Sequence, residues 1–197
     1  MVDGRTRLYL LSLIALASFA PLRATAQGFR FANIPWGSNG TTMKQMMSDQ
    51  GLSFVEVDSE GDYKFKGPLN GYEAVVWGLM SADGVAKISV TLFTPDEKAR
   101  KAYREMKVAL TTKYGTPAEV LERFDSPYRD GDGREDQAMR EDKGHLLSLW
   151  KMPVDRDTSY LGLQVTEKLN VFLAYEGPQW GAELDRRRAK PKQTNPF

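Results

Sequence analysis

One stretch of the sequence, residues 90–117 (VTLFTPDEKARKAYREMKVALTTKYGTP), contains the end of a strand, a helix and both helix ends. Apolar side chains recur every three or four positions across residues 99–114, which places them on one face of a helix. Thr94 and Glu97 have the spacing of a capping box, in which each side chain bonds a free backbone N–H. Gly115 then ends the helix. Because a helix with one apolar stripe must pack on another element, the flanking strands are its expected support.

Short segments that alternate apolar and polar residues surround this helix and predict strands. Turns containing glycine, proline, asparagine or aspartate separate them. The predicted strands are 28–33, 52–57, 62–66, 72–80 and 85–93 before the helix, and 118–124, 146–152, 159–165 and 169–175 after it.

A second, shorter helix is predicted between the first two strands, with Met43, Met46 and Met47 on one side and Gly51 at its end. Each half of the chain then runs strand, helix, glycine and three strands. Two tandem β-α-β-β-β units are one interpretation, and a single meander is the other. Both predict the same fold class: α+β, with a curved antiparallel sheet of about six to eight strands and two helices on one face.

The start of the chain has the parts of a secretory signal peptide, which we assign to residues 1–26. Arg5 and Arg7 precede an uncharged apolar run at 8–20, and Ala-Thr-Ala at 24–26 forms a cleavage site. The run has 13 residues, fewer than the ~20 that a membrane-spanning helix needs. We therefore expect export to the periplasm or beyond, and no transmembrane segment after cleavage. The chain has no cysteine, which excludes disulfides and bacterial lipidation.

The remaining chain is long enough for a single domain, which we place at residues 28–176. A charged insertion at 125–144 interrupts it and is long for a connection within a compact domain. Residues 177–197 are predicted to form a flexible basic tail. A weak contact with polyanions is expected through three arginines of this tail, Arg186, Arg187 and Arg188. The net charge of +1 gives no reason to expect a nucleic-acid partner.

This order of elements behind a signal peptide resembles small exported bacterial proteins built from helix-plus-meander units. The β-lactamase inhibitor proteins are one such group, and small envelope-assembly proteins are another. The sequence PWG at residues 35–37 and KYGTP at residues 113–117 carry the resemblance. It implies an exported α+β fold and assigns no functional residue. The inhibitor group relies on disulfides, which this chain lacks.

The acidic insertion contains the best candidate for a metal site. A calcium loop starting at Asp130 would place Asp132 at its third position and Glu141 at its twelfth. Arg134 falls at the fifth position, where a ligand belongs, and Glu135 falls at the sixth, where glycine is needed. A solvated loop of mixed charge is the alternative interpretation.

Hydrolysis is the main enzymatic alternative. His145 is the only histidine and could serve a catalytic triad, but no G-x-S-x-G motif accompanies it. Pairs of carboxylates are the other route to hydrolysis. The candidate pairs are Glu56 with Asp58 and Glu183 with Asp185. No phosphate-binding or dinucleotide-binding motif is present, so no cofactor is expected.

Four tryptophans are spread along the chain. Trp77 and Trp150 lie in predicted strands and are expected in the core. Trp36 and Trp180 lie in turns that contain proline and glycine, where exposed tryptophan could anchor a partner. The alternative is that each of these two closes an end of the sheet.

These observations favour an exported, non-enzymatic binding protein of the bacterial cell envelope. The open face of the sheet and the insertion at 125–144 are its expected contact surfaces. A hydrolase and an inhibitor of a secreted enzyme, using the insertion as a protruding loop, are the alternatives. If the open face binds a partner, exposed aromatic side chains should gather on it.

Overall fold

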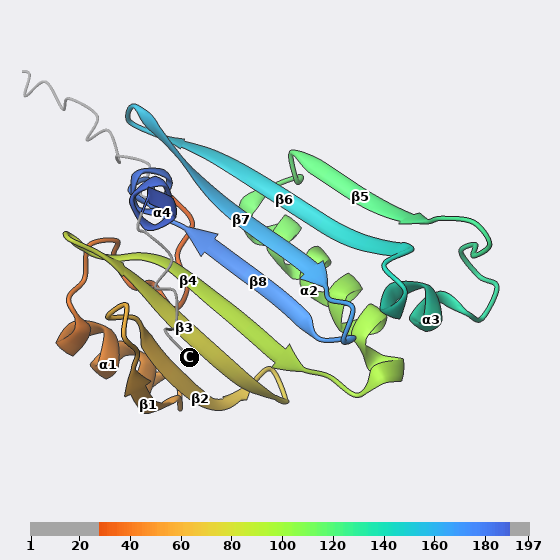
Figure 1. Ribbon diagram of the computed structural model, residues 1–197, viewed down its shortest axis with the longest axis horizontal. Helices are drawn as coiled ribbons and strands as arrows, with labels where there is room; N and C mark the ends of the chain where they lie inside the picture. Colours follow the sequence, from red (N-terminus) through yellow and green to blue (C-terminus); the bar gives the residue numbers. More distant parts are fainter. Residues whose placement is uncertain (1–27, 190–197) are drawn as a thin grey trace, which may run out of the picture.

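The computed structural model describes residues 28–189, so the predicted signal peptide and the end of the basic tail lie outside the described residues (Figure 1). In chain order the elements are α1 (Gly40–Asp49), β1 (Ser53–Val57), β2 (Tyr63–Leu69), β3 (Tyr72–Ser81), β4 (Gly84–Phe93), the short 3-10 helix η1 (Asp96–Lys98), α2 (Ala99–Tyr114), β5 (Glu119–Phe124), α3 (Glu135–Arg140), β6 (Gly144–Val154), β7 (Asp157–Val165), β8 (Val171–Glu176) and α4 (Trp180–Ala189).

The eight strands form one open antiparallel sheet in the order β1-β2-β3-β4-β8-β7-β6-β5. Each half of the chain is a helix followed by a four-stranded meander: α1 with β1 to β4, and α2 with β5 to β8. The two meanders meet at the centre of the sheet, where β4 pairs with β8 and Val90 lies opposite Leu173. The predicted class, an α+β fold built on an antiparallel sheet, is confirmed.

The core lies between the sheet and the helices that cover one of its faces, which we call the helix face. Met43 and Met47 of α1 and Tyr103 of α2 are fully buried there. Strand residues meet them with the period of two that strand geometry requires. In β6, for example, Leu146, Ser148 and Trp150 are buried, while Leu147 and Leu149 point to the other face. The sheet's other face, which we call the open face, is turned toward the viewer in Figure 1, with α2 behind the strands.

The predicted first strand is wrong: residues 28–30 have no regular structure, and residues 31–33 form a bend and a turn. Ala32 and Asn33 have φ of 48° and 58°, which an extended strand does not allow. The aromatic residues of this segment pack on the core instead. The Phe29 ring lies edge-on to Tyr114 of α2, 5.0 Å away, and the Phe31 ring lies 5.8 Å from Tyr175. Each unit therefore begins with its helix and contains four strands.

The predicted capping box at the start of α2 is also wrong. The Thr94 hydroxyl donates to the Leu169 carbonyl at 2.6 Å and is buried, so it does not bond a helix N–H. The helix instead begins through the 3-10 turn η1, and no side chain caps either start. Thr94 thus fastens the β4–α2 connection to the β7–β8 turn. The predicted end is confirmed, because Gly115 follows α2 with φ of 85°.

The insertion at residues 125–144 is folded against the body of the protein. Its helix α3 buries Glu135, Ala138 and Met139. Arg100 of α2 bonds Asp136 at 2.7 Å and lies 3.6 Å from Glu135, so α3 is tied to α2.

The first part of the predicted flexible tail is a helix. Residues 180–189 form α4, which follows β8 directly and packs against β4 at one end of the sheet (Figure 1). Within residues 28–189, none of the helices has the length and apolar character needed to cross a bilayer.

Candidate functional site: the open face of the sheet

Side chains on the open face line up in rows, because residues paired across antiparallel strands point to the same side. One row crosses the sheet through the paired residues Trp77, Ser89, Ala174, Gly162 and Leu149. The next row runs through Val75, Thr91, Phe172, Gln164, Leu147 and Leu121. A third runs through Leu79, Lys87, Glu176, Tyr160 and Lys151. The face is therefore apolar at its centre and charged toward its margins.

The first row has large side chains at its two ends and small ones in its middle. Ser89, Ala174 and Gly162 occupy adjacent strands, while Trp77 and Leu149 stand at the ends. A hollow lies over the part of this row formed by β6, β7 and β8, and we call it the central groove. It has a volume of about 260 Å³ and is lined by Leu149, Tyr160, Gly162, Ala174 and Glu176.

Gly162 keeps the groove open. A Cβ atom built on Gly162 would have no atom within 4 Å, so the space above this residue is empty among the described residues. The backbone of Gly162 is not in the left-handed region, so the turn geometry that often requires glycine is not the reason for it here. In the interior of a sheet, glycine weakens a strand and often marks a place where another molecule approaches closely.

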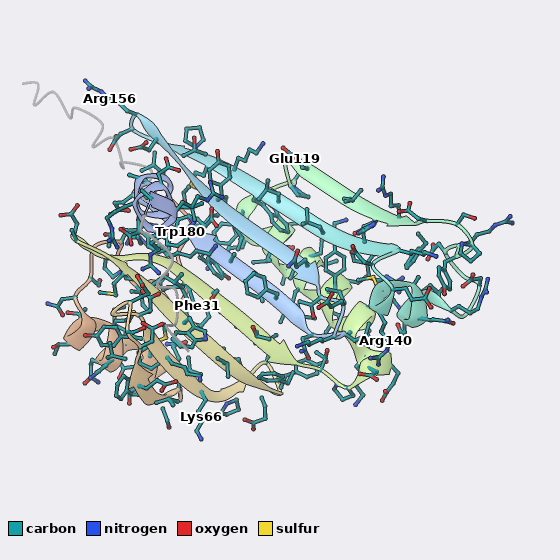
Figure 2. All side chains as sticks on the ribbon, viewed as in Figure 1. Phe31, Lys66, Glu119, Arg140, Arg156 and Trp180 are labelled. Carbon is teal, nitrogen blue, oxygen red and sulfur yellow. The ribbon has the colours of Figure 1, made fainter. Side chains whose placement is uncertain are left out.

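The charges near the groove are paired. Lys87 bonds Glu176 at 2.8 Å, and Lys64 bonds Glu56 at 3.0 Å while its ammonium lies 5.1 Å from the centre of the Trp77 ring. Figure 2 shows Lys66 at the β2 side of the sheet and Glu119 at the β5 edge, where Glu119 pairs with Lys151. The groove thus has no unpaired charge at its floor, which suits an apolar occupant.

The three aromatic side chains in these rows are not fully exposed, and they are not the ones chosen from the sequence. Trp77, Tyr160 and Phe172 are half-buried, and each stands in one of the rows around the groove. Trp77 was expected in the core. The sequence feature that could have indicated this position is the continuous apolar run of β3. Alternate residues of that run face the core and the open face.

Trp180 is buried and Trp36 is half-buried. Trp180 is 6% exposed, and the cations of Lys87 and Arg187 lie 4.8 and 5.5 Å from its ring centre. Trp36 is half-buried and packs against the core, and its indole nitrogen is buried with no hydrogen-bond partner among the described residues. Figure 2 shows Trp180 where α4 meets the sheet. Trp180 thus lies at an end of the sheet, as the alternative interpretation expected, and Trp36 packs against the core.

The three carboxylates of the candidate calcium loop do not converge. Asp132 accepts the backbone N–H groups of Arg129 and Arg134 at 3.1 and 2.8 Å, which holds its pKa below the usual range. Glu141 accepts from the Gln137 amide at 2.9 Å. Within residues 28–189, no group of three or more acids or histidines is placed to hold a metal ion.

His145 lies on β6 and faces the end of the open face beside α3. Its Nε2 is 3.5 Å from Asp125 Oδ2, and the side chain is 25% exposed. In the described part of the chain, no hydrogen bond joins His145 to a hydroxyl group. The nearest strand hydroxyl along β6, that of Ser148, is fully buried on the helix face and lies 2.8 Å from the Tyr103 hydroxyl. The geometry therefore supplies an acid neighbour to His145 but no nucleophile.

The two carboxylate pairs proposed for hydrolysis are engaged elsewhere. Glu56 pairs with Lys64, and Asp58 accepts backbone N–H groups of Glu60 and Asp62 in a turn. Glu183 is buried and bonded to Arg186 and Arg187, while Asp185 is exposed. Two of the three tail arginines are thus occupied within the chain.

Searches against protein-family models, curated proteins and solved structures gave no match to this chain.

Proposed function

We propose that this chain is an exported, non-enzymatic binding protein of the bacterial cell envelope, and that it binds a protein partner through its open face. The observation that carries the proposal is the central groove. An apolar hollow lies over the small residues Gly162 and Ala174, beside Leu149, in the sheet. A protruding apolar side chain of a partner fits such a hollow better than a charged ligand does.

The surroundings of the groove support a protein as the partner. Half-buried Trp77, Tyr160 and Phe172 offer rigid aromatic surface, which contributes strongly at interfaces. The paired charges of Lys87 with Glu176, and of Lys64 with Glu56, form a polar rim. An apolar centre with a polar rim is the usual arrangement of a protein interface.

Export rests on the sequence alone. The apolar run at residues 8–20 and the small residues at 24–26 are the support for a periplasmic or secreted location. The layout that resembles exported inhibitor and envelope-assembly proteins adds to it. We propose an envelope location on this basis.

Site-specific photo-crosslinking in the producing cells tests the proposal. A photo-reactive amino acid at Thr91, which lies on the open face beside Phe172, should trap a partner protein. The same amino acid at Val108 is the matched control, because Val108 lies on α2 and is 67% exposed. A product formed from Thr91 and missing from Val108 supports binding through the open face. Identical products from both positions, or none from Thr91, would contradict it.

A further inference from the structure

A second hollow lies at the end of the sheet, where β6 and β7 separate. The two strands are paired from Leu147 and Gln164 to the turn between them. Before Leu147, β6 pairs only with β5, and beyond Gln164, β7 pairs only with β8. The end of α3 lies below the gap. The result is a cleft of about 320 Å³, which we call the β6–β7 cleft.

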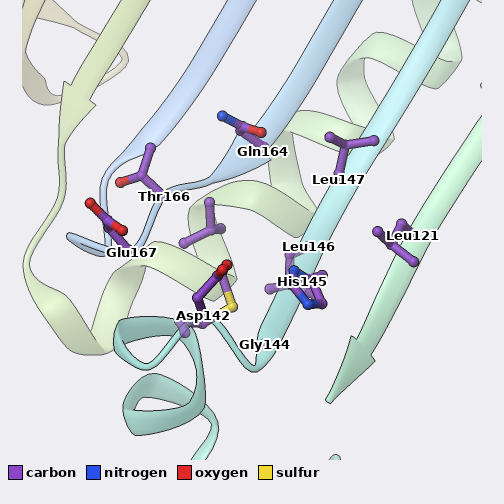
Figure 3. A pocket seen from close by; sticks show the side chains of 11 residues that line it. Leu121, Asp142, Gly144, His145, Leu146, Leu147, Gln164, Thr166 and Glu167 are labelled. Carbon is purple, nitrogen blue, oxygen red and sulfur yellow. The ribbon is translucent and has the colours of Figure 1, made fainter. Parts of the chain in front are cut away.

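The lining of this cleft is mixed, with apolar side chains and, at its mouth, two carboxylates. Leu121, Met139, Leu146, Leu147 and Val165 supply the apolar walls. Figure 3 shows Thr166 and Glu167 on one side of the opening, His145 and Leu147 on the other, and Asp142 at its lower end. The Gln164 amide adds a further polar group.

The two carboxylates at the mouth have no cation of their own. Within residues 28–189, neither Asp142 nor Glu167 forms an ion pair, and both side chains are exposed. Arg123 and Lys143 are engaged by other groups, whereas Lys168, next to Glu167 in the chain, is exposed and forms no ion pair within residues 28–189. Arg123 lies 3.4 Å from Asp125, and the Lys143 ammonium lies 4.0 Å from Glu141 and over the Tyr128 ring.

We propose that the β6–β7 cleft binds an organic cation, a primary ammonium or guanidinium group on a short alkyl chain. The alkyl chain would lie against Leu147 and Leu121, and the cationic head would lie between Asp142 and Glu167. Carboxylates hold guanidinium and ammonium groups through charge-assisted hydrogen bonds. An anion would be repelled by the same carboxylates, and a bare metal ion would lack a converging set of ligands among the described residues.

This chemistry has two sources: a free small amine, or a lysine or arginine side chain of a partner protein. The proposal stands apart from the partner of the open face, because each is tested by its own probe. Agmatine serves as the free cation, and an acetylated, amidated Gly-Arg-Gly peptide serves as the side chain in its protein setting.

The experiment is a titration of the full chain followed by NMR, read at the Met139 methyl group and the His145 ring. Agmatine or the peptide should shift these signals in a saturable and salt-sensitive manner, because the contact is between charges. Butyrate, which has an alkyl chain and a negative head, should not shift them. Agmatine binding without peptide binding identifies a free cation as the ligand, and peptide binding identifies a side chain.

Two double variants decide whether the cleft is responsible. Asp142→Asn with Glu167→Gln removes both charges without changing size, and should weaken binding about tenfold, as expected for two exposed charge contacts. Asp155→Asn with Asp157→Asn is the matched control, because it makes the same charge change at exposed positions at the other end of the β6–β7 hairpin. It should leave binding unchanged. No saturable shift with either cation, or equal weakening by both double variants, would overturn the proposal.

Discussion

Arg187 of α4 and Asp62 of the β1–β2 turn form a bidentate ion pair, although they lie 125 residues apart in the chain. Arg187 Nη1 lies 2.6 Å from Asp62 Oδ2, and Nη2 lies 2.8 Å from Oδ1. The same guanidinium donates to Glu183 and to the Met80 carbonyl. Asp62 also accepts the Met80 N–H. The C-terminal helix is thus fastened to the first hairpin by a connected polar network.

Replacing Arg187 with alanine should destabilise the protein by about 3 kcal/mol, since it leaves the buried Asp62 carboxylate without a cation and Glu183 with Arg186 alone. The Asp62 and Glu183 side chains are 7% and 3% exposed. Urea unfolding measures the difference from wild type. Arg188→Ala is the control, because Arg188 is 71% exposed, and its effect should stay within about 0.5 kcal/mol. Equal effects of the two substitutions would show that the network does not hold α4 in place.

Acid should weaken the same network. Hydrogen bonds from Arg186 and Arg187 lower the pKa of Glu183 to about 2, below its ordinary value of 4.5, against the opposing effect of burial. Because the folded pKa is the lower one, Glu183 stabilises the fold above pH 4.5, and this contribution is lost as the pH falls toward 2. It amounts to at most about 3 kcal/mol.

The measurement is the free energy of unfolding at several pH values for wild type and Glu183→Gln. The wild type should lose more stability than the variant between pH 4.5 and 2. Parallel curves for the two proteins would mean that Glu183 ionises in the folded state as it does in the unfolded chain.

The Tyr103 hydroxyl joins α2 to the second meander. It donates to Glu122 at 2.9 Å on β5 and lies 2.8 Å from the Ser148 hydroxyl on β6. Burial and the neighbouring Glu122 carboxylate raise the pKa of Tyr103. Tyr103→Phe should cost about 1–3 kcal/mol in urea unfolding, because it removes a hydrogen-bond partner from the fully buried Ser148.

A double variant separates this hydrogen bond from the packing of the ring. If the loss comes from the unpaired Ser148 hydroxyl, adding Ser148→Ala to Tyr103→Phe should recover part of the stability. If the losses of stability in the two single variants simply add in the double variant, the unpaired Ser148 hydroxyl is not the cause of the loss.

Filling the central groove should not harm the fold. The Cβ atom of Gly162→Leu would have no atom within 4 Å. The free energy of unfolding should therefore stay the same or rise by up to about 1 kcal/mol. Gly78→Leu is the contrasting substitution, because a Cβ there would collide with Met43 Sδ on the helix face. That variant should be strongly destabilised. Thermal unfolding of both checks the prediction, and a lower melting temperature for Gly162→Leu would show that the groove is needed for folding.

Local patterns in the sequence predicted most of the fold, because strands and helices follow from short periodicities. The alternation in β4, β6 and β7 and the apolar stripe of α2 were sufficient to place those elements within a few residues. Alternation gave a wrong prediction at residues 28–33, where the aromatic side chains pack on Tyr114 and Tyr175 and the backbone does not join the sheet.

Contacts between distant positions could not be predicted. Thr94 has the spacing of a helix cap, but its hydroxyl bonds the Leu169 carbonyl, 75 residues later. Arg187 lies in a segment whose composition predicted disorder, but its guanidinium bonds the buried Asp62, 125 residues earlier in the chain. The central groove depends on two small residues from neighbouring strands, Gly162 and Ala174, which lie side by side only once β7 has paired with β8.

The central claim is that the groove at Gly162 receives a partner, and one comparison tests it most directly. The photo-reactive amino acid is placed at Thr91 in wild type and in the Gly162→Leu background, with equal amounts of folded protein confirmed by thermal unfolding. The account predicts that the crosslinked product obtained in wild type is lost, or reduced at least about tenfold, when Leu fills the groove. The same yield of the same product in both backgrounds would contradict it.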